Sequence, residues 1–181
     1  MHPPARTAAL PEHRFLGASI RTEPVPDDIA RWLADDDPRP VVHVSFGSFL
    51  SARSDVLARV VAALRPLPVR VALATGSADP GLLGQAPEHW LSREFLPQIA
   101  VLRRAAVTVT HGGNNSITEA LALGPRILVL PFSTDQFAGA EALETASRAD
   151  VLDPNTATVE ELRGAVQMLL DETSLRPARP R

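Results

Sequence analysis

The residue types best suited to chemistry lie in one stretch, Thr108–Gln136, which reads TVTHGGNNSITEALALGPRILVLPFSTDQ. Two adjacent glycines stand directly before a helical pattern of apolar residues, so they place free backbone N–H groups at a helix start. These groups and the positive end of the helix dipole favour an anion, and glycine lets the backbone approach it closely. Asn115 and Ser116 add side-chain donors sized for phosphate oxygens. We therefore expect a phosphate site that includes Gly113, Asn115 and Ser116.

Groups that can bind hydroxyls follow the phosphate residues. Glu119 lies three residues after Ser116, one turn further along the same helix face, where a carboxylate can accept two vicinal hydroxyls. Asp135 and Gln136 follow the next apolar strand, and we expect them at its end, on the same edge of the sheet. A phosphate site, a diol acceptor and a second hydroxyl-binding pair together predict a site for a nucleotide sugar.

The elements that must position these residues alternate between apolar strands and amphipathic helices. Strands are expected at residues 41–45, 69–74, within 89–95, and at 105–110, 127–130 and 150–152. Helices are expected at residues 27–34, 54–64, 98–104, 137–146 and 159–170, and another should begin after residue 113. Ser54 or Asp55 would cap the second helix, and Pro97 would be the first residue of the third. Residues 78–87 are expected to form an irregular loop. This alternation predicts an α/β fold, a doubly wound, Rossmann-like parallel sheet of about six strands.

The topology of such a sheet selects a ligand site of its own. In the usual strand order, 3-2-1-4-5-6, a switch point lies between the first and fourth strands, and ligands bind beyond the carboxyl ends there. Those ends carry Phe46-Gly47-Ser48 and the segment from His111 to Ser116. We therefore add Ser48 and His111 to the expected phosphate site.

Composition excludes other classes of protein. A length of 181 residues, 45% hydrophobic and 22% charged, is typical of one soluble globular domain, and the net charge of −3 provides no basic field for nucleic acid. The absence of cysteine and the spacing of the five histidines indicate no metal site. No stretch has the length of a membrane span or the pattern of a signal peptide, so we expect a cytoplasmic protein.

Three pieces of the sequence resemble the donor-binding signature of glycosyltransferases related to the UDP-glucuronosyl and macrolide glycosyltransferases, which have the two-domain GT-B fold. The pieces are Phe95-Leu96-Pro97-Gln98, the segment from His111 to Glu119, and the segment from Pro131 to Gln136, at the spacing of that family. The resemblance covers about residues 13–172 and matches only the C-terminal, donor-binding half of such an enzyme.

The resemblance implies a role for each predicted site residue. Phe95 would stack on the base, Gln98 would contact the ribose, and His111 would donate a hydrogen bond to the phosphate. The predicted nucleoside-binding residues are thus Phe95, Leu96, Gln98 and Glu119, and the predicted sugar-binding residues are Asp135 and Gln136. Each has a structural alternative: Ser116 and Glu119 also form a capping-box pattern, Phe95 also suits a core, and Gln98 also suits a solvated helix start.

The function that the resemblance implies is the nucleotide-sugar-binding half of an inverting glycosyltransferase that uses a UDP- or dTDP-hexose and a small-molecule acceptor hydroxyl. The catalytic base, a histidine, would come from an N-terminal acceptor-binding domain or subunit, so no catalytic residue is expected in this chain. No metal or other cofactor is expected. Two alternatives remain open: a non-catalytic nucleotide-sugar-binding module, and a fragment of a nucleotide-sugar epimerase.

The expected domain organisation is simple. Residues 1–26 are rich in proline and are expected to form a linker or tail. Residues 27–172 would form the donor-binding domain, and residues 173–181 a disordered tail.

Overall fold

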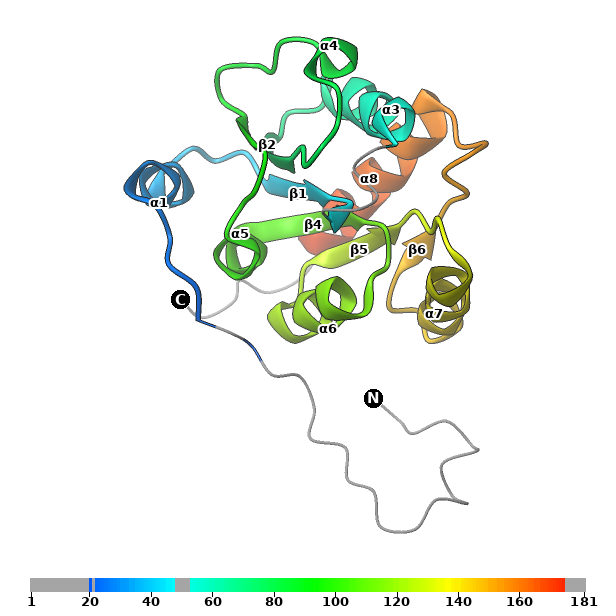
Figure 1. Ribbon diagram of the computed structural model, residues 1–181. Coiled ribbons are helices and arrows are strands. Elements are labelled where there is room, and N and C mark those ends of the chain that lie inside the picture. The colour runs from blue at the N-terminus through cyan, green and yellow to red at the C-terminus, as the bar shows by residue number, and fades with distance from the viewer. Residues whose placement is uncertain (1–19, 21, 48–52, 175–181) are drawn as a thin grey trace, which may run out of the picture.

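A computed structural model describes residue 20 and residues 22–47 and 53–174, which form a six-stranded, all-parallel sheet in the order β3-β2-β1-β4-β5-β6 (Figure 1). The strands are β1 (Val41–Ser45), β2 (Arg70–Ala74), β3 (Leu91–Arg93), β4 (Ala105–Thr110), β5 (Arg126–Val129) and β6 (Asp150–Val151). The helices are α1 (Asp27–Ala34), α3 (Ser54–Leu64), α4 (Pro80–Leu83), α5 (Gln98–Arg104), α6 (Asn114–Leu123), α7 (Thr134–Thr145) and α8 (Val159–Ser174). The predicted fold class is confirmed, and the strand order is the usual one for this class.

The sheet is covered on both faces, with α3 and α8 on one side and α5, α6 and α7 on the other (Figure 1). Because side chains alternate along a strand, Val42 and Val44 of β1 pack toward α3 and α8, whereas Val41 packs toward α1 and α5. The second face carries two separate apolar clusters, one beneath α1 and α5 and one among α5, α6 and α7. Burial of both faces explains why the strands read as continuous apolar runs.

Two local predictions near α3 are wrong. Residues 78–87 contain a helix, α4, because Asp79 caps it by accepting a hydrogen bond from the Gly81 N–H at 2.8 Å and Pro80 fits its first turn. Helix α3 begins at Ser54 without a side-chain cap, and the Ser54 hydroxyl instead accepts a hydrogen bond from the Asp79 N–H at 2.9 Å. The serine therefore joins two neighbouring segments and does not cap its own helix.

Three helix boundaries also differ from the sequence-based expectation. Helix α7 begins at Thr134, so Asp135 and Gln136 lie in its first turn and not at the end of a strand. Pro97 is the cap residue before α5 and not its first helical residue. Helix α8 has the expected capping box between Thr158 and Glu161, and it continues to Ser174, past the expected end. Most of both predicted tails lies outside the described residues.

Candidate functional site

The imidazole of His111 lies between two glycines at the point where β1 and β4 end. The two strands pair in parallel, with Ser45 beside Thr110, so the residues that follow them are neighbours. A Cβ atom on Gly47 would lie 3.2 Å from Cε1 of His111, and one on Gly113 would lie 2.5 Å from Nε2. At Gly113 the ring occupies the space that a Cβ atom would need, whereas at Gly47 a Cβ atom would be in tight contact with the ring. The sheet therefore brings the first and fourth strand ends together, as its topology predicts.

The turn after His111 requires glycine for a second reason. Gly112 has a φ angle of +89°, which L residues rarely adopt, and a Cβ there would lie 2.9 Å from Cγ1 of Val129. The turn directs the chain from β4 into α6 with Gly113 as the cap residue. Within the described part of the chain no side chain caps the first turn of this ten-residue helix, and Asn114 and Asn115 are exposed there. The start of α6 thus presents the uncapped N–H groups that an anion prefers.

The position of Ser116 excludes the capping-box alternative. Because α6 begins at Asn114, Ser116 is its third residue and cannot occupy the cap position. Among the described residues, no hydrogen bond of the Asn115 or Ser116 side chain to another part of the chain is found. Both residues lie in the first turn of α6, which follows the His111 turn directly. Ser48, the remaining predicted phosphate residue, lies outside the described residues.

The environment of His111 favours the neutral imidazole. Burial lowers the pKa of His111, and the nearby Ser45 backbone and Asp135 carboxylate only partly offset this effect. Its Nδ1 atom is buried and has no hydrogen-bond partner within the described part of the chain. A buried nitrogen without a partner is uncommon in folded proteins, and here it lies at the proposed anion site.

Two predicted nucleoside residues meet between α5 and α6. Nε2 of Gln98 donates a hydrogen bond to Oε2 of Glu119 at 2.5 Å. Glu119 is buried, with 5% of its surface exposed, and Gln98 is half-buried. Gln98 does begin α5, as its structural alternative expects, but its side chain is half-buried and bonds to Glu119. The pair places an amide and a carboxylate together, a combination suited to vicinal hydroxyls.

The two remaining nucleoside candidates behave differently. Phe95, in the loop between β3 and α5, is 65% exposed, so the alternative of a core phenylalanine is wrong. A ring that is exposed to this extent can stack on a planar ligand. Leu96, by contrast, is partly buried and packs against the apolar cluster of α1 and α5.

Asp135 and Gln136 are adjacent in sequence but point to different surroundings. Asp135 is exposed, and the hydrogen bond from the Ser133 hydroxyl, at 2.6 Å, lowers the pKa of its carboxyl group together with nearby backbone groups and His111. Gln136 is 7% exposed, and its Oε1 accepts a hydrogen bond from the Phe132 N–H at 2.9 Å. The Asp135 carboxylate thus lies near His111, whereas the Gln136 side-chain oxygen stabilises the turn before α7.

Sequence reasoning missed an aromatic pair beside the site. The rings of Phe46 and Phe132 meet edge to face with centroids 5.3 Å apart, and the Arg53 guanidinium lies 5.4 Å from the Phe132 centroid. Phe46 follows β1, Phe132 follows β5, and Arg53 precedes α3. Their only sequence signal is an aromatic residue just after each of two strands, which the prediction did not use. The two rings belong to the apolar core below the ends of β1 and β5.

The described residues contain no group of three or more histidine, aspartate or glutamate side chains that could hold a metal ion. None of the helices formed by these residues combines the length and the apolar character that crossing a membrane requires.

Comparisons with known proteins agree on one family. The family profile described as UDP-glucoronosyl and UDP-glucosyl transferase matches residues 7–177. Demethyllactenocin mycarosyltransferase of Streptomyces fradiae is 33% identical over 165 residues, which cover 91% of this chain and 35% of that protein. NDP-glycosyltransferase YjiC of Bacillus subtilis is 28% identical over 89% of this chain and 41% of that protein. The chain thus spans less than half the length of these curated relatives.

Solved structures give the same result. The glycotransferase of kitacinnamycin has a TM-score of 0.71 and 30% identity, over 91% of this chain and 40% of that chain. Glycosyltransferase VinC, solved in complex with dTDP, has a TM-score of 0.71 and 28% identity, over 84% of this chain and 38% of that chain. The fold is that of the C-terminal half of a GT-B glycosyltransferase.

Proposed function

This chain belongs to the UDP-glucoronosyl and UDP-glucosyl transferase family, and we propose that it is the nucleotide-sugar-binding half of an inverting glycosyltransferase. Its donor would be a UDP- or dTDP-hexose, and the acceptor a hydroxyl of a small molecule. The named relatives are glycosyltransferases, and the structural relative VinC was solved with dTDP. Because the chain spans less than half of these relatives, we propose that catalysis requires an N-terminal acceptor-binding domain or subunit.

The observation that carries this proposal is the setting of His111. A half-buried imidazole lies against Gly47 and Gly113, beside the uncapped start of α6, and its Nδ1 has no partner among the described residues. A diphosphate would supply the negative charge that this arrangement of donors favours. It would also raise the pKa of His111, since an anion stabilises the imidazolium.

The proposed reaction is a single displacement at the anomeric carbon of the donor. A base in the N-terminal domain takes the proton of the acceptor hydroxyl, whose oxygen forms the new glycosidic bond while the bond to the diphosphate breaks. The leaving diphosphate gains negative charge, which the N–H groups of α6 and the His111 side chain would stabilise. A well-placed donor in such a site contributes about 3 kcal/mol to lowering the barrier.

The remaining residues would fix the rest of the donor. Phe95 offers an exposed ring for the base, and the Gln98–Glu119 pair offers groups for the ribose hydroxyls. Asp135, exposed and close enough to His111 to influence its pKa, would accept hydroxyls of the hexose. Leu96, Gln136 and Ser48 stay predicted contacts.

A second candidate function is nucleotide-sugar binding without catalysis. The groups placed at the site, the start of α6 and the Gln98–Glu119 pair, are suited to binding, and no general base has been placed among the described residues. Product analysis with added acceptor and N-terminal domain separates the two functions. Transfer of the hexose supports the transferase, whereas binding without transfer supports the module.

Calorimetric titration with UDP, dTDP and GDP in the presence of a chelator tests the proposal directly. We expect weak binding of UDP or dTDP without a metal ion. Ser116→Ala should weaken it by roughly 1.5–3 kcal/mol, the contribution of a hydrogen bond to a charged group. UDP should bind more tightly than 2′-deoxy-UDP if Glu119 accepts both ribose hydroxyls. Failure of all three nucleotides to bind, or an absolute need for a divalent cation, would contradict the proposal.

A further inference from the structure

We infer that Glu23 is a positioning residue for the nucleoside-binding pair Gln98–Glu119, and that it acts through helix α5. The inference rests on the proposed function for the identity of the ligand. Its structural basis is independent of any ligand. The segment formed by residues 23–34, which we call the strap, holds α5 at both of its ends.

At the first turn of α5, the strap supplies a cap that the helix itself lacks. Its cap residue, Pro97, makes no side-chain cap hydrogen bond. Oε1 of Glu23 instead accepts a hydrogen bond from the Ile99 N–H at 2.6 Å, from 76 residues away in the sequence. A carboxylate at this place satisfies an orphan N–H group and the positive end of the helix dipole.

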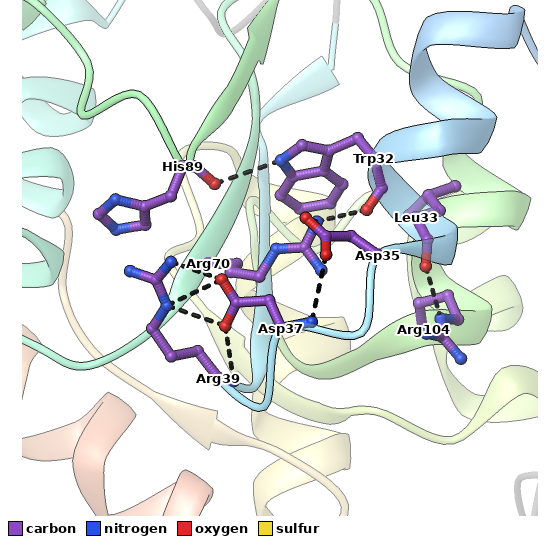
Figure 2. A network of polar contacts seen from close by, with 8 residues as sticks. All are labelled: Trp32, Leu33, Asp35, Asp37, Arg39, Arg70, His89 and Arg104. Carbon is purple, nitrogen blue, oxygen red and sulfur yellow. Dashed lines mark hydrogen bonds and ion pairs between the residues drawn. The ribbon is translucent and has the colours of Figure 1, made fainter.

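At the last turn of α5, the strap supplies an acceptor. Nε of Arg104, the final residue of the helix, donates to the Leu33 carbonyl at 3.0 Å (Figure 2). That carbonyl is itself held in place, because Arg70 donates to the neighbouring Trp32 carbonyl and its guanidinium lies 4.0 Å from the Trp32 ring centroid. The end of α1 is therefore a fixed support for α5.

Apolar contacts fill the space between the two polar contacts. Ile29 and Leu33 of α1 are buried together with Val101 of α5, and Val25 of the strap packs against this cluster. Helix α5 consequently has little room to move unless the strap moves with it.

The first turn of α5 also carries the link to the site. Gln98 directly precedes Ile99, and its side chain donates to Glu119 on α6. Loss of the Glu23 carboxylate would leave the Ile99 N–H unpaired and loosen the turn that orients Gln98. The described phosphate residues lie on the His111 turn and the start of α6, and within the described part of the chain the hydrogen bond found for Glu23 goes to Ile99 instead. Loss of Glu23 should therefore weaken nucleoside recognition and leave phosphate recognition unchanged.

The test compares UDP with pyrophosphate on the full 181-residue chain. Glu23→Ala should weaken UDP binding about three- to tenfold, the effect of one misplaced hydrogen bond, with pyrophosphate affinity unchanged. Glu23→Gln keeps an amide oxygen that can accept from Ile99, so it should restore most of the UDP affinity. Arg31→Ala is the matched control, because among the described residues the Arg31 side chain bonds within α1, to the Asp27 carbonyl at 3.3 Å.

A second measurement needs no ligand. The side-chain amide resonance of Gln98 should shift in Glu23→Ala and stay in place in Arg31→Ala. Unchanged UDP affinity in Glu23→Ala, or equal losses for UDP and pyrophosphate, would overturn the inference. If the unmutated chain does not bind UDP, the proposed function fails. The Gln98 resonance then decides whether Glu23 positions the Gln98 side chain, and an unmoved resonance overturns that role.

Discussion

Two polar regions of this chain use the same kinds of side chain in opposite ways. In the anchor region around α1, formed by Trp32, Leu33, Asp35, Asp37, Arg39, Arg70, His89 and Arg104, the polar groups bond to one another (Figure 2). Hydrogen bonds from Arg39 hold the pKa of Asp37 below its usual range, and the Trp32 indole donates to the His89 carbonyl at 3.2 Å. In the site around His111, a buried nitrogen has no partner among the described residues and the helix start is uncapped.

The difference distinguishes polar groups that stabilise the fold from polar groups that are available to a ligand. A polar group that is satisfied within the chain contributes to folding, and its removal exposes an unpaired partner. A polar group without a partner costs stability, and proteins retain such groups mainly where a ligand completes them. Changes in the anchor should therefore alter unfolding, whereas changes in the His111 site should alter binding.

The largest effect should come from Arg70, which is 2% exposed in the middle of the anchor. Arg70→Ala removes the donor to the Trp32 carbonyl and the cation over the Trp32 ring, and it should lower the free energy of unfolding by roughly 3 kcal/mol. Denaturant titration measures this loss. Arg39→Ala should have a smaller effect because its ion pair with Asp37 is more exposed than Arg70 is. Equal losses in the two variants would contradict the central role of Arg70.

His43 is a satisfied polar group that lies within the sheet itself. Its Nδ1 lies 2.9 Å from Oγ1 of Thr108, and burial lowers the pKa of His43 to about 4. Because the unfolded chain binds this proton at about pH 6.5, stability is complete above that value and is lost as the pH falls toward 4. The loss over this window should reach roughly 3 kcal/mol.

Denaturant titrations between pH 7 and pH 4 give this dependence. Other groups titrate in the same window, so the difference between the unmutated chain and His43→Gln isolates the histidine. A His43→Gln variant whose stability falls as steeply as that of the unmutated chain would show that His43 does not carry the effect.

Gly113 tests the expectation that changes in the His111 site alter binding. In Gly113→Ala the new Cβ would lie 2.5 Å from Nε2 of His111, so the ring must leave its place between the glycines. Affinity for pyrophosphate should fall about tenfold or more, as expected for the loss of a charged hydrogen bond. Gly164→Ala is the control: a Cβ there meets nothing within 4 Å, and the variant should gain about 0.5–1 kcal/mol of stability without a change in binding.

The smallest and most selective effect is expected at Asp135. Because this carboxylate is exposed beside His111, Asp135→Ala should weaken binding of the nucleotide sugar about tenfold and leave binding of the bare diphosphate unchanged. Paired titrations of the variant and the unmutated chain measure both affinities. Equal losses for the two ligands would assign Asp135 to the fold, and the comparison between anchor and site would then fail at this residue.

The parts of the molecule that sequence predicted are those encoded locally. The apolar strands and amphipathic helices indicated the fold class, and the segment from His111 to Glu119 indicated the turn and helix start, because their residues are neighbours in the chain. The strand order was the usual one for that class and not a result of local patterns. The contact of Glu23 with Ile99 joins residues 76 positions apart, and no local pattern indicates it. Helix α4 was missed because Asp-Pro-Gly suits both a turn and a helix start. Gln136 was placed at a strand end because the bond from Phe132 that begins α7 has no sequence signature.

The two outer strands of the sheet are very short. Strand β3 has three residues and β6 has two, whereas β4 at the centre has six. An outer strand presents unpaired backbone groups on which another chain can add a strand, and a short one provides few such groups. Arg93 at the end of β3 and Asp150 in β6 place charged residues along these edges. Edge-to-edge aggregation is therefore disfavoured, and contacts with other chains are directed toward the helices and the loops.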